Sequence, residues 1–126
     1  MIVRESTHRA SPLSPHRATI GKRIPIQVSA IGRAWPGWCA DEEREATLAL
    51  LRSRAAAGEL ARDAACVRRL LRKTHRRGYA LNRVEMSSEP SVSAIAFPIL
   101  VSGHAIAAVN LVLHRSAVSE RQIVMR

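Results

Sequence analysis

Apolar residues are most concentrated in residues 91–113, where the runs SVSAIAFPIL and AIAAVNLVL flank a short polar turn. Both runs contain β-branched residues that suit a pleated surface packed on at least one face. Gly103 lies in the turn, where glycine adopts positive φ without a steric penalty. The pattern predicts a β-hairpin at the centre of a sheet. Asn110 is an amide in an otherwise apolar strand, so it needs a hydrogen-bond partner, a water or a ligand.

Two segments in the middle of the chain have the spacing of amphipathic helices. Asp41 is placed to cap the first, and the acidic residues that follow it favour the helix dipole. The second begins near Asp63 and ends before Gly78, which suits a left-handed C-cap. Their predicted buried positions are Leu48, Leu50, Leu51 and Ala55 in the first helix, and Val67, Leu70, Leu71 and Thr74 in the second.

The other predicted elements are short. Ser29 can cap a helix that Pro36 then ends. Residues 1–7 and 24–28 predict strands at an edge of the sheet, the second because Pro25 lacks a backbone donor. A further strand is expected at residues 79–81. The order strand, strand, helices, strand, hairpin indicates an α+β fold with helices on a mostly antiparallel sheet.

The length of 126 residues suits one domain, and with 3% aromatic residues its core must be aliphatic. Cys39 and Cys66 have no metal-type spacing, which is typical of reduced thiols in a cytoplasmic protein. No apolar run approaches the ~20 residues of a membrane span. We therefore expect a cytoplasmic protein with no membrane partner.

The net charge of +10 favours a polyanionic partner, nucleic acid above all. The charge is spread along the chain, and its one dense cluster lies in residues 68–77. On a helix, cations beside leucines usually form a solvated face. For that helix taken alone, the solvated face is the favoured interpretation.

The residues do not form a pattern typical of catalysis. The five histidines show no i, i+4 pair, and the isolated glycines form no phosphate loop. The carboxylates of residues 41–45 gather at a helix start, where capping explains them better than acid–base chemistry. We therefore expect no enzyme, and we assign no catalytic residue, metal site or cofactor.

The residues do indicate one possible pocket. The start of the Ser29 helix would face the strand that bears Asn110, and Ala94 and Ala96 would leave room between them. A few polar groups in an apolar hollow are typical of a small-ligand site. A tightly packed core that needs small side chains explains the same pattern, and periodicity alone favours that core.

Six stretches, in order and at suitable spacing, resemble the effector-binding domain of IclR-type transcriptional regulators. Each motif is weak by itself, but together they cover nearly the whole chain. The SPLS and Asn-Leu-Val stretches resemble the branch that senses aromatic acids. Two of the six have two parts, REST with SPLS (4–7 and 11–14) and GKRIPI with SAIGRA (21–26 and 29–34). The other four are DEER (41–44), RGYA (77–80), AIAFPI (94–99) and AAVNLVL (107–113).

The resemblance implies a GAF/PAS-like fold, an antiparallel sheet flanked by helices, with a pocket for a small organic acid, aromatic or keto. Asn110 would hydrogen-bond a ligand oxygen, and the amides of Ala30 and Ile31 would receive a carboxylate. The implied partners are this acid and further copies of the chain, as a dimer or tetramer. The positions that would line the pocket are Ser29, Ala30, Ile31, Ala94, Asn110 and Val112.

The chain lacks segments that members of this family usually carry. We expect a single partial effector-binding domain over residues 1–126, incomplete at both ends and without the winged helix-turn-helix domain. DNA would then be contacted only through a separate domain absent from this chain. The alternatives are a small basic nucleic-acid-binding protein that uses residues 68–77, and a non-functional truncated fragment of a regulator.

Overall fold

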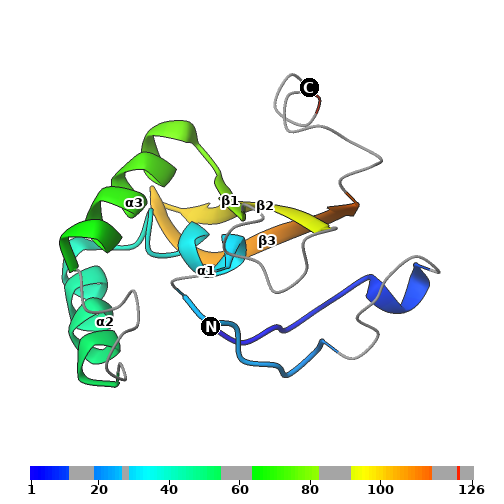
Figure 1. Ribbon diagram of the computed structural model, residues 1–126, viewed down its shortest axis with the longest axis horizontal. Coiled ribbons are helices and arrows are strands. Elements are labelled where there is room, and N and C mark those ends of the chain that lie inside the picture. Colours follow the sequence, from blue (N-terminus) through cyan, green and yellow to red (C-terminus); the bar gives the residue numbers. More distant parts are fainter. Residues whose placement is uncertain (12–18, 27–28, 55–63, 83–91, 115–121, 123–126) are drawn as a thin grey trace.

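The computed structural model describes residues 1–11, 19–26, 29–54, 64–82, 92–114 and 122. Its sheet contains β1 (Ala80–Asn82), β2 (Val92–Val101) and β3 (His104–His114), all antiparallel in the order β1-β2-β3. Figure 1 shows α1 (Ala30–Ala34) against the sheet, with α2 (Asp41–Arg54) and α3 (Ala64–Arg77) together at one end. This arrangement confirms the predicted α+β fold.

The predicted hairpin is confirmed as β2 and β3. Ser102 and Gly103 form its turn with φ values of 50° and 80°. Positive φ at both central positions matches the twist of the flanking strands, and Gly103 adopts it without a Cβ penalty. The register shifts once, between Ile99 and Leu100, where Ile106 is the extra residue in β3. His104, expected in the turn, begins β3 instead.

The position of α1 depends on very close packing. Ser29 caps the helix by accepting a hydrogen bond from the Gly32 amide at 2.9 Å. A Cβ added to Gly32 would lie 2.3 Å from the Pro25 carbonyl oxygen and 2.7 Å from Ile26 Cα. A helix can lie this close to the preceding segment only if residue 32 has no side chain. The end of this helix before Pro36 is as predicted.

Alanine side chains form the core between α1 and the sheet. Ala30 and Ala34 of α1 meet Ala80 of β1 and Ala96 of β2, and all four are at most 1% exposed. Ile31 packs against the edge of this cluster, as do two sheet residues, Ala94 and Ala108. Because methyl groups fill the interface, the backbone of α1 lies close to the strands.

A second core joins α2 to α3. Leu48, Val67 and Leu71 are buried there, and Leu51 packs against them. Leu50 was predicted to be buried and is 50% exposed, because it points away from α3; that prediction is wrong. Ala55 lies outside the described residues.

The ends of these two helices largely follow the prediction. Asp41 is the first residue of α2 rather than the residue before it, so its carboxylate lies within the first turn. Gly78 has the left-handed φ of 83° that was expected after α3, and its amide bonds the His75 carbonyl at 3.1 Å.

The N-terminal segment forms less sheet than predicted. Residues 1–7 contribute only one bridge, between Ile2 and Arg23, supported by hydrogen bonds such as Val3 N to Lys22 O at 3.0 Å. Residues 24–26 form no strand, and residues 27–28 lie outside the described part of the chain. A 3-10 turn, η1 (His8–Ala10), was not predicted. The prolines of this region favour turns over extended pairing.

Replacing Gly32 with alanine tests the close approach of α1. The added methyl must displace backbone atoms, so we expect Gly32→Ala to lower the free energy of unfolding by about 2–3 kcal/mol in urea titrations. Gly21→Ala is the control, because a Cβ there meets nothing within 4 Å. It should lose only about 1 kcal/mol, from its left-handed backbone. Equal losses in the two variants would contradict the packing described here.

Candidate functional site

The small residues under α1 form a packed core, with Ala30 and Ala96 at most 1% exposed. This is the alternative to a pocket that the sequence pattern favoured. Ala30 is buried against the sheet, and Ile31 and Ala94 lie at the edge of the same cluster. Three of the six predicted site residues are therefore in one place. The other three, Ser29, Asn110 and Val112, border it and are partly exposed.

The sheet register places two asparagines on the α1 side of the sheet. Ala96 pairs with Asn110 of β3, while Ala94 pairs with Val112 of β3 and with Asn82 of β1. Directly paired residues share a face, and residues two apart on one strand share it too. Asn82 and Asn110 therefore lie on either side of β2, diagonally across the two alanines.

Both asparagines carry a buried polar atom without a partner. Asn82 Oδ1 and Asn110 Oδ1 are inaccessible to solvent, and neither accepts a hydrogen bond from the described residues. Such orphaned oxygens are uncommon in folded proteins, where buried polar atoms are nearly always satisfied. The sequence pattern predicted that the Asn110 amide needs a hydrogen-bond partner. The family resemblance implied that Asn82 or Glu85 lies near the mouth of the pocket. The strand register places Asn82 opposite Ala94, and Glu85 lies outside the described residues.

The Ser29 side chain forms its hydrogen bonds within the loop and helix α1. Its hydroxyl donates to the Pro25 carbonyl at 2.6 Å and accepts from the Gly32 amide at 2.9 Å. These two bonds fix the step from loop to helix. Its assignment as a pocket-lining residue stays a prediction, and the hydroxyl is already engaged.

A buried cation lies behind this surface. Arg33 is 2% exposed and donates a hydrogen bond to the Leu81 carbonyl, which ties α1 to β1. Desolvation lowers the pKa of Arg33 to about 10, so the guanidinium is still charged at neutral pH. Sequence reasoning did not identify Arg33, because nothing in its neighbours marks it as buried.

A small cavity opens between α1, α2 and α3. Its volume is about 20 Å3, room for a water molecule but not for an organic acid. None of the six predicted site residues lines it. The lining residues are Ile26, Arg33, Pro36, Arg44, Thr47, Leu48, Cys66, Val67, Leu70 and Leu71.

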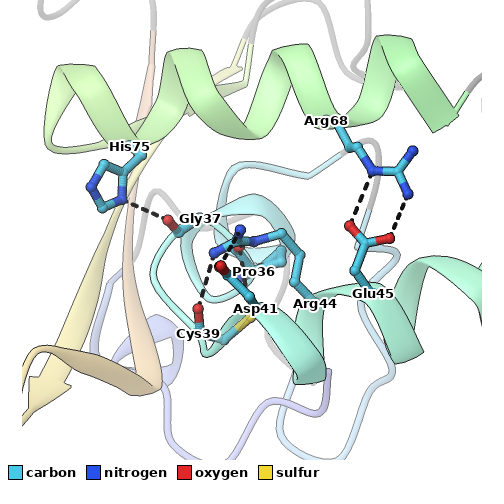
Figure 2. Close-up of polar contacts among 8 residues, drawn as sticks. All are labelled: Pro36, Gly37, Cys39, Asp41, Arg44, Glu45, Arg68 and His75. Atoms are coloured by element: carbon cyan, nitrogen blue, oxygen red, sulfur yellow. Dashed lines mark hydrogen bonds and ion pairs between the residues drawn. The ribbon is translucent and has the colours of Figure 1, made fainter.

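Arg44 holds the turn that connects α1 to α2. Figure 2 shows its guanidinium donating to the carbonyl oxygens of Pro36 at 2.9 Å and Cys39 at 3.0 Å, and to the Asp41 carboxylate at 2.9 Å. Three acceptors in one fork fix the loop geometry, since the guanidinium is planar and rigid. The same turn buries Cys39, and burial raises the pKa of its thiol.

The same turn is joined to α3 and to β3. His75 Nδ1 donates to the Gly37 carbonyl at 2.7 Å, and the His75 ring lies 5.2 Å from that of Trp38. The Ala105 amide of β3 bonds the Trp38 carbonyl at 3.0 Å. Helices and sheet are thus connected through one short loop.

An open groove of about 810 Å3 runs between α2 and α3. The Arg68 guanidinium crosses it to the Glu45 carboxylate, with Nε 3.0 Å from Oε1, and this hydrogen bond lowers the pKa of Glu45 (Figure 2). Half of the ten residues that line the groove are arginines. Its residues are Gly37, Asp41, Arg44, Glu45, Arg68, Arg69, Leu71, Arg72, His75 and Arg76.

In the described part of the chain, no three His, Cys, Asp or Glu side chains gather as metal ligands. None of the helices seen is long and apolar enough to cross a membrane. Cys39 and Cys66 form no disulfide.

Comparison with known protein families identifies the family of this domain. The family described as bacterial transcriptional regulator IclR C-terminal matches residues 5–125. The chain belongs to this family. The C-terminal domains of this family are regulatory rather than catalytic.

Solved IclR structures share the fold. The regulator of Thermotoga maritima has a TM-score of 0.68 at 19% identity, over 86% of this chain and 44% of that one. The Brucella abortus regulator has a TM-score of 0.65 at 23% identity, over 86% and 41%. An IclR homolog of Microbacterium hydrocarbonoxydans, solved with 4-hydroxybenzoate, has a TM-score of 0.63 at 27% identity, over 86% and 44%. The chain spans less than half the length of these proteins.

Removing the Arg44 guanidinium tests the loop that connects the two parts of this IclR domain. Arg44→Ala leaves the Pro36 and Cys39 carbonyls without their donor, so we expect about 2 kcal/mol less stability by chemical denaturation. Arg52→Ala, an exposed arginine on the same helix, is the matched control and should change stability by less than about 0.5 kcal/mol. If both variants unfold alike, Arg44 does not hold the turn.

Proposed function

We propose that this IclR domain binds a small organic acid, aromatic or keto, on the α1 side of its sheet. The observation that carries the proposal is the pair of buried, unpartnered oxygens at Asn82 and Asn110. An amide offers an acceptor oxygen and two N–H donors, so it can bind either a hydroxyl or a carboxylate of a ligand. A ligand hydroxyl would donate to one of these oxygens, whereas an ionised carboxylate only accepts and would bind the amide N–H groups.

The shape of this region supports the same proposal. Ala94 and Ala96 carry only methyl groups between the two asparagines, and Val112 adds an apolar wall. An apolar surface with a few convergent polar groups is typical of small-ligand sites. In this proposal the amides of Ala30 and Ile31 face the carboxylate, and Ser29 positions them through its cap.

The ligand class is supported by one relative. The IclR homolog from Microbacterium hydrocarbonoxydans was solved with 4-hydroxybenzoate, which has a phenolic hydroxyl and a carboxylate. Two polar ends on a flat apolar ring suit two amides separated by alanines. Reading of DNA sequence would belong to a separate domain, and ligand binding would change which arrangement of the regulator is populated.

A thermal-shift screen of the chain against aromatic, keto and dicarboxylic acids tests this site. A ligand at 100 times its dissociation constant adds about 2.7 kcal/mol, so we expect a shift of several degrees for one class of acid. Asn110→Leu should abolish the shift. Without ligand it should melt no lower than the parent, because it replaces an orphaned polar group with an apolar one of similar size.

Leu50→Ala is the control, because Leu50 lies on α2, is 50% exposed and belongs neither to the proposed acid site nor to the sheet. It should keep the ligand shift. The site is wrong if the shift survives in Asn110→Leu, and the proposed function fails if no acid stabilises the folded chain.

We also propose that the domain forms a homo-oligomer, dimer or tetramer, through the sheet face opposite α1. Ile99, Val109 and Leu111 lie on that face and are 45–51% exposed. No Lys, Arg, Asp or Glu occurs in β3, so this strand adds none of these charges to that face. Two chains of net charge +10 repel least along such an uncharged strand.

Sedimentation velocity tests this interface with two like substitutions. Leu111→Lys should shift the chain from oligomer to monomer at micromolar concentrations, because it places a cation in the apolar contact. Leu50→Lys adds the same charge at a position that is equally exposed, 50% against 51%, and should leave the oligomer intact. A monomeric parent chain would refute the proposal.

A further inference from the structure

Helix α3 carries charge of one sign only. Its fourteen residues include six arginines or lysines and no Asp or Glu. Like charges three and four residues apart repel each other and disfavour the helix. Arg76 and Arg77 in the last turn complement the helix dipole, but Arg69, Arg72 and Lys73 lie before it and gain less. The cations of α3 therefore repel one another, and a bound polyanion would reduce this repulsion.

The tertiary structure narrows what this polyanion can be. The apolar side of α3 is already used, because Val67 and Leu71 are buried against α2 and Thr74 is also buried. A basic amphipathic helix binds a lipid surface by inserting its apolar face. α3 has no free apolar face to insert, so its cations are available only for contacts between charges.

Of the carboxylates that line the groove, only Glu45 pairs with a cation of α3. Asp41 and Glu45 line the groove, and each is already in an ion pair, with Arg44 and Arg68 respectively (Figure 2). Within the described residues, no carboxylate pairs with Arg69, Arg72 or Arg76, which line the groove and are exposed. The positive potential of this surface therefore remains.

The spacing of these three arginines suits a row of phosphates. Positions i, i+3 and i+7 lie along one side of a helix and span about 10 Å at 1.5 Å per residue. A guanidinium binds a phosphate through two parallel hydrogen bonds. We call Arg69, Arg72 and Arg76 the arginine row.

We propose that the arginine row binds the phosphate backbone of duplex nucleic acid without reading its base sequence. Apart from Leu71, the groove has no large apolar side chain, and binding of an acidic peptide usually depends on buried side-chain anchors. No Trp, Tyr or Phe lines it, although single strands are usually held by stacking on such rings. This contact is independent of the proposed acid site.

Fluorescence anisotropy with a labelled duplex of about 20 base pairs, between about 50 and 200 mM salt, tests the proposal. Each phosphate contact contributes about −0.9 to the slope of log affinity against log salt, so three contacts give a slope near −3. The triple variant Arg69→Gln, Arg72→Gln, Arg76→Gln should bind at least about tenfold more weakly at low salt, with a slope near zero. It should melt no lower than the parent, because like-charge repulsion is removed.

A second triple variant, Arg4→Gln, Lys22→Gln, Arg23→Gln, removes the same charge from exposed residues of the N-terminal segment. It should keep its affinity within about twofold and its salt slope, if the contact is local. Equal losses in the two variants would mean that net charge alone attracts DNA, and would overturn the proposal. So would no association at low salt, equally tight binding to the single strand, or equally tight binding to polyglutamate of the same charge.

Discussion

The close approach of α1 to the sheet is the constraint on which the rest of this domain depends. Gly32 lies where any Cβ would overlap the Pro25 carbonyl, and alanines fill the space between helix and strands. Larger side chains at those positions would move the helix outward. Asn82 and Asn110 flank two alanines of β2 and carry unpartnered buried oxygens, so the packed core and the proposed site share these positions.

A single short turn then sets the position of the remaining helices. Arg44 binds two carbonyls of that turn, His75 of α3 binds a third, and the Ala105 amide joins it to β3. The pair α2–α3 is thereby held at one end of the sheet (Figure 1). The proposed acid site and the arginine row share no residue, so each can be altered separately.

The proposed ligand site accounts for the orphaned oxygens of Asn82 and Asn110. In that proposal a ligand hydroxyl completes a hydrogen bond that the fold leaves open, whereas an enzyme would need a nucleophile or a general base within reach of its substrate. The buried charge of Arg33 is compatible with the same proposal. It ties α1 to β1 through the Leu81 carbonyl, and a neighbouring ligand would act on a rigid support.

Local pattern alone determined the hairpin, the three helices, the break before Pro36 and the left-handed Gly78, because each depends on residues close in the chain. The burial of Leu50 was predicted wrongly, because the apolar stripe of α2 is chosen by where α3 lies. Strand register placed Asn82 opposite Ala94, and packing buried Arg33 and joined Arg44 to the turn. These are contacts between residues distant in sequence or set by the fold, so no local pattern contains them.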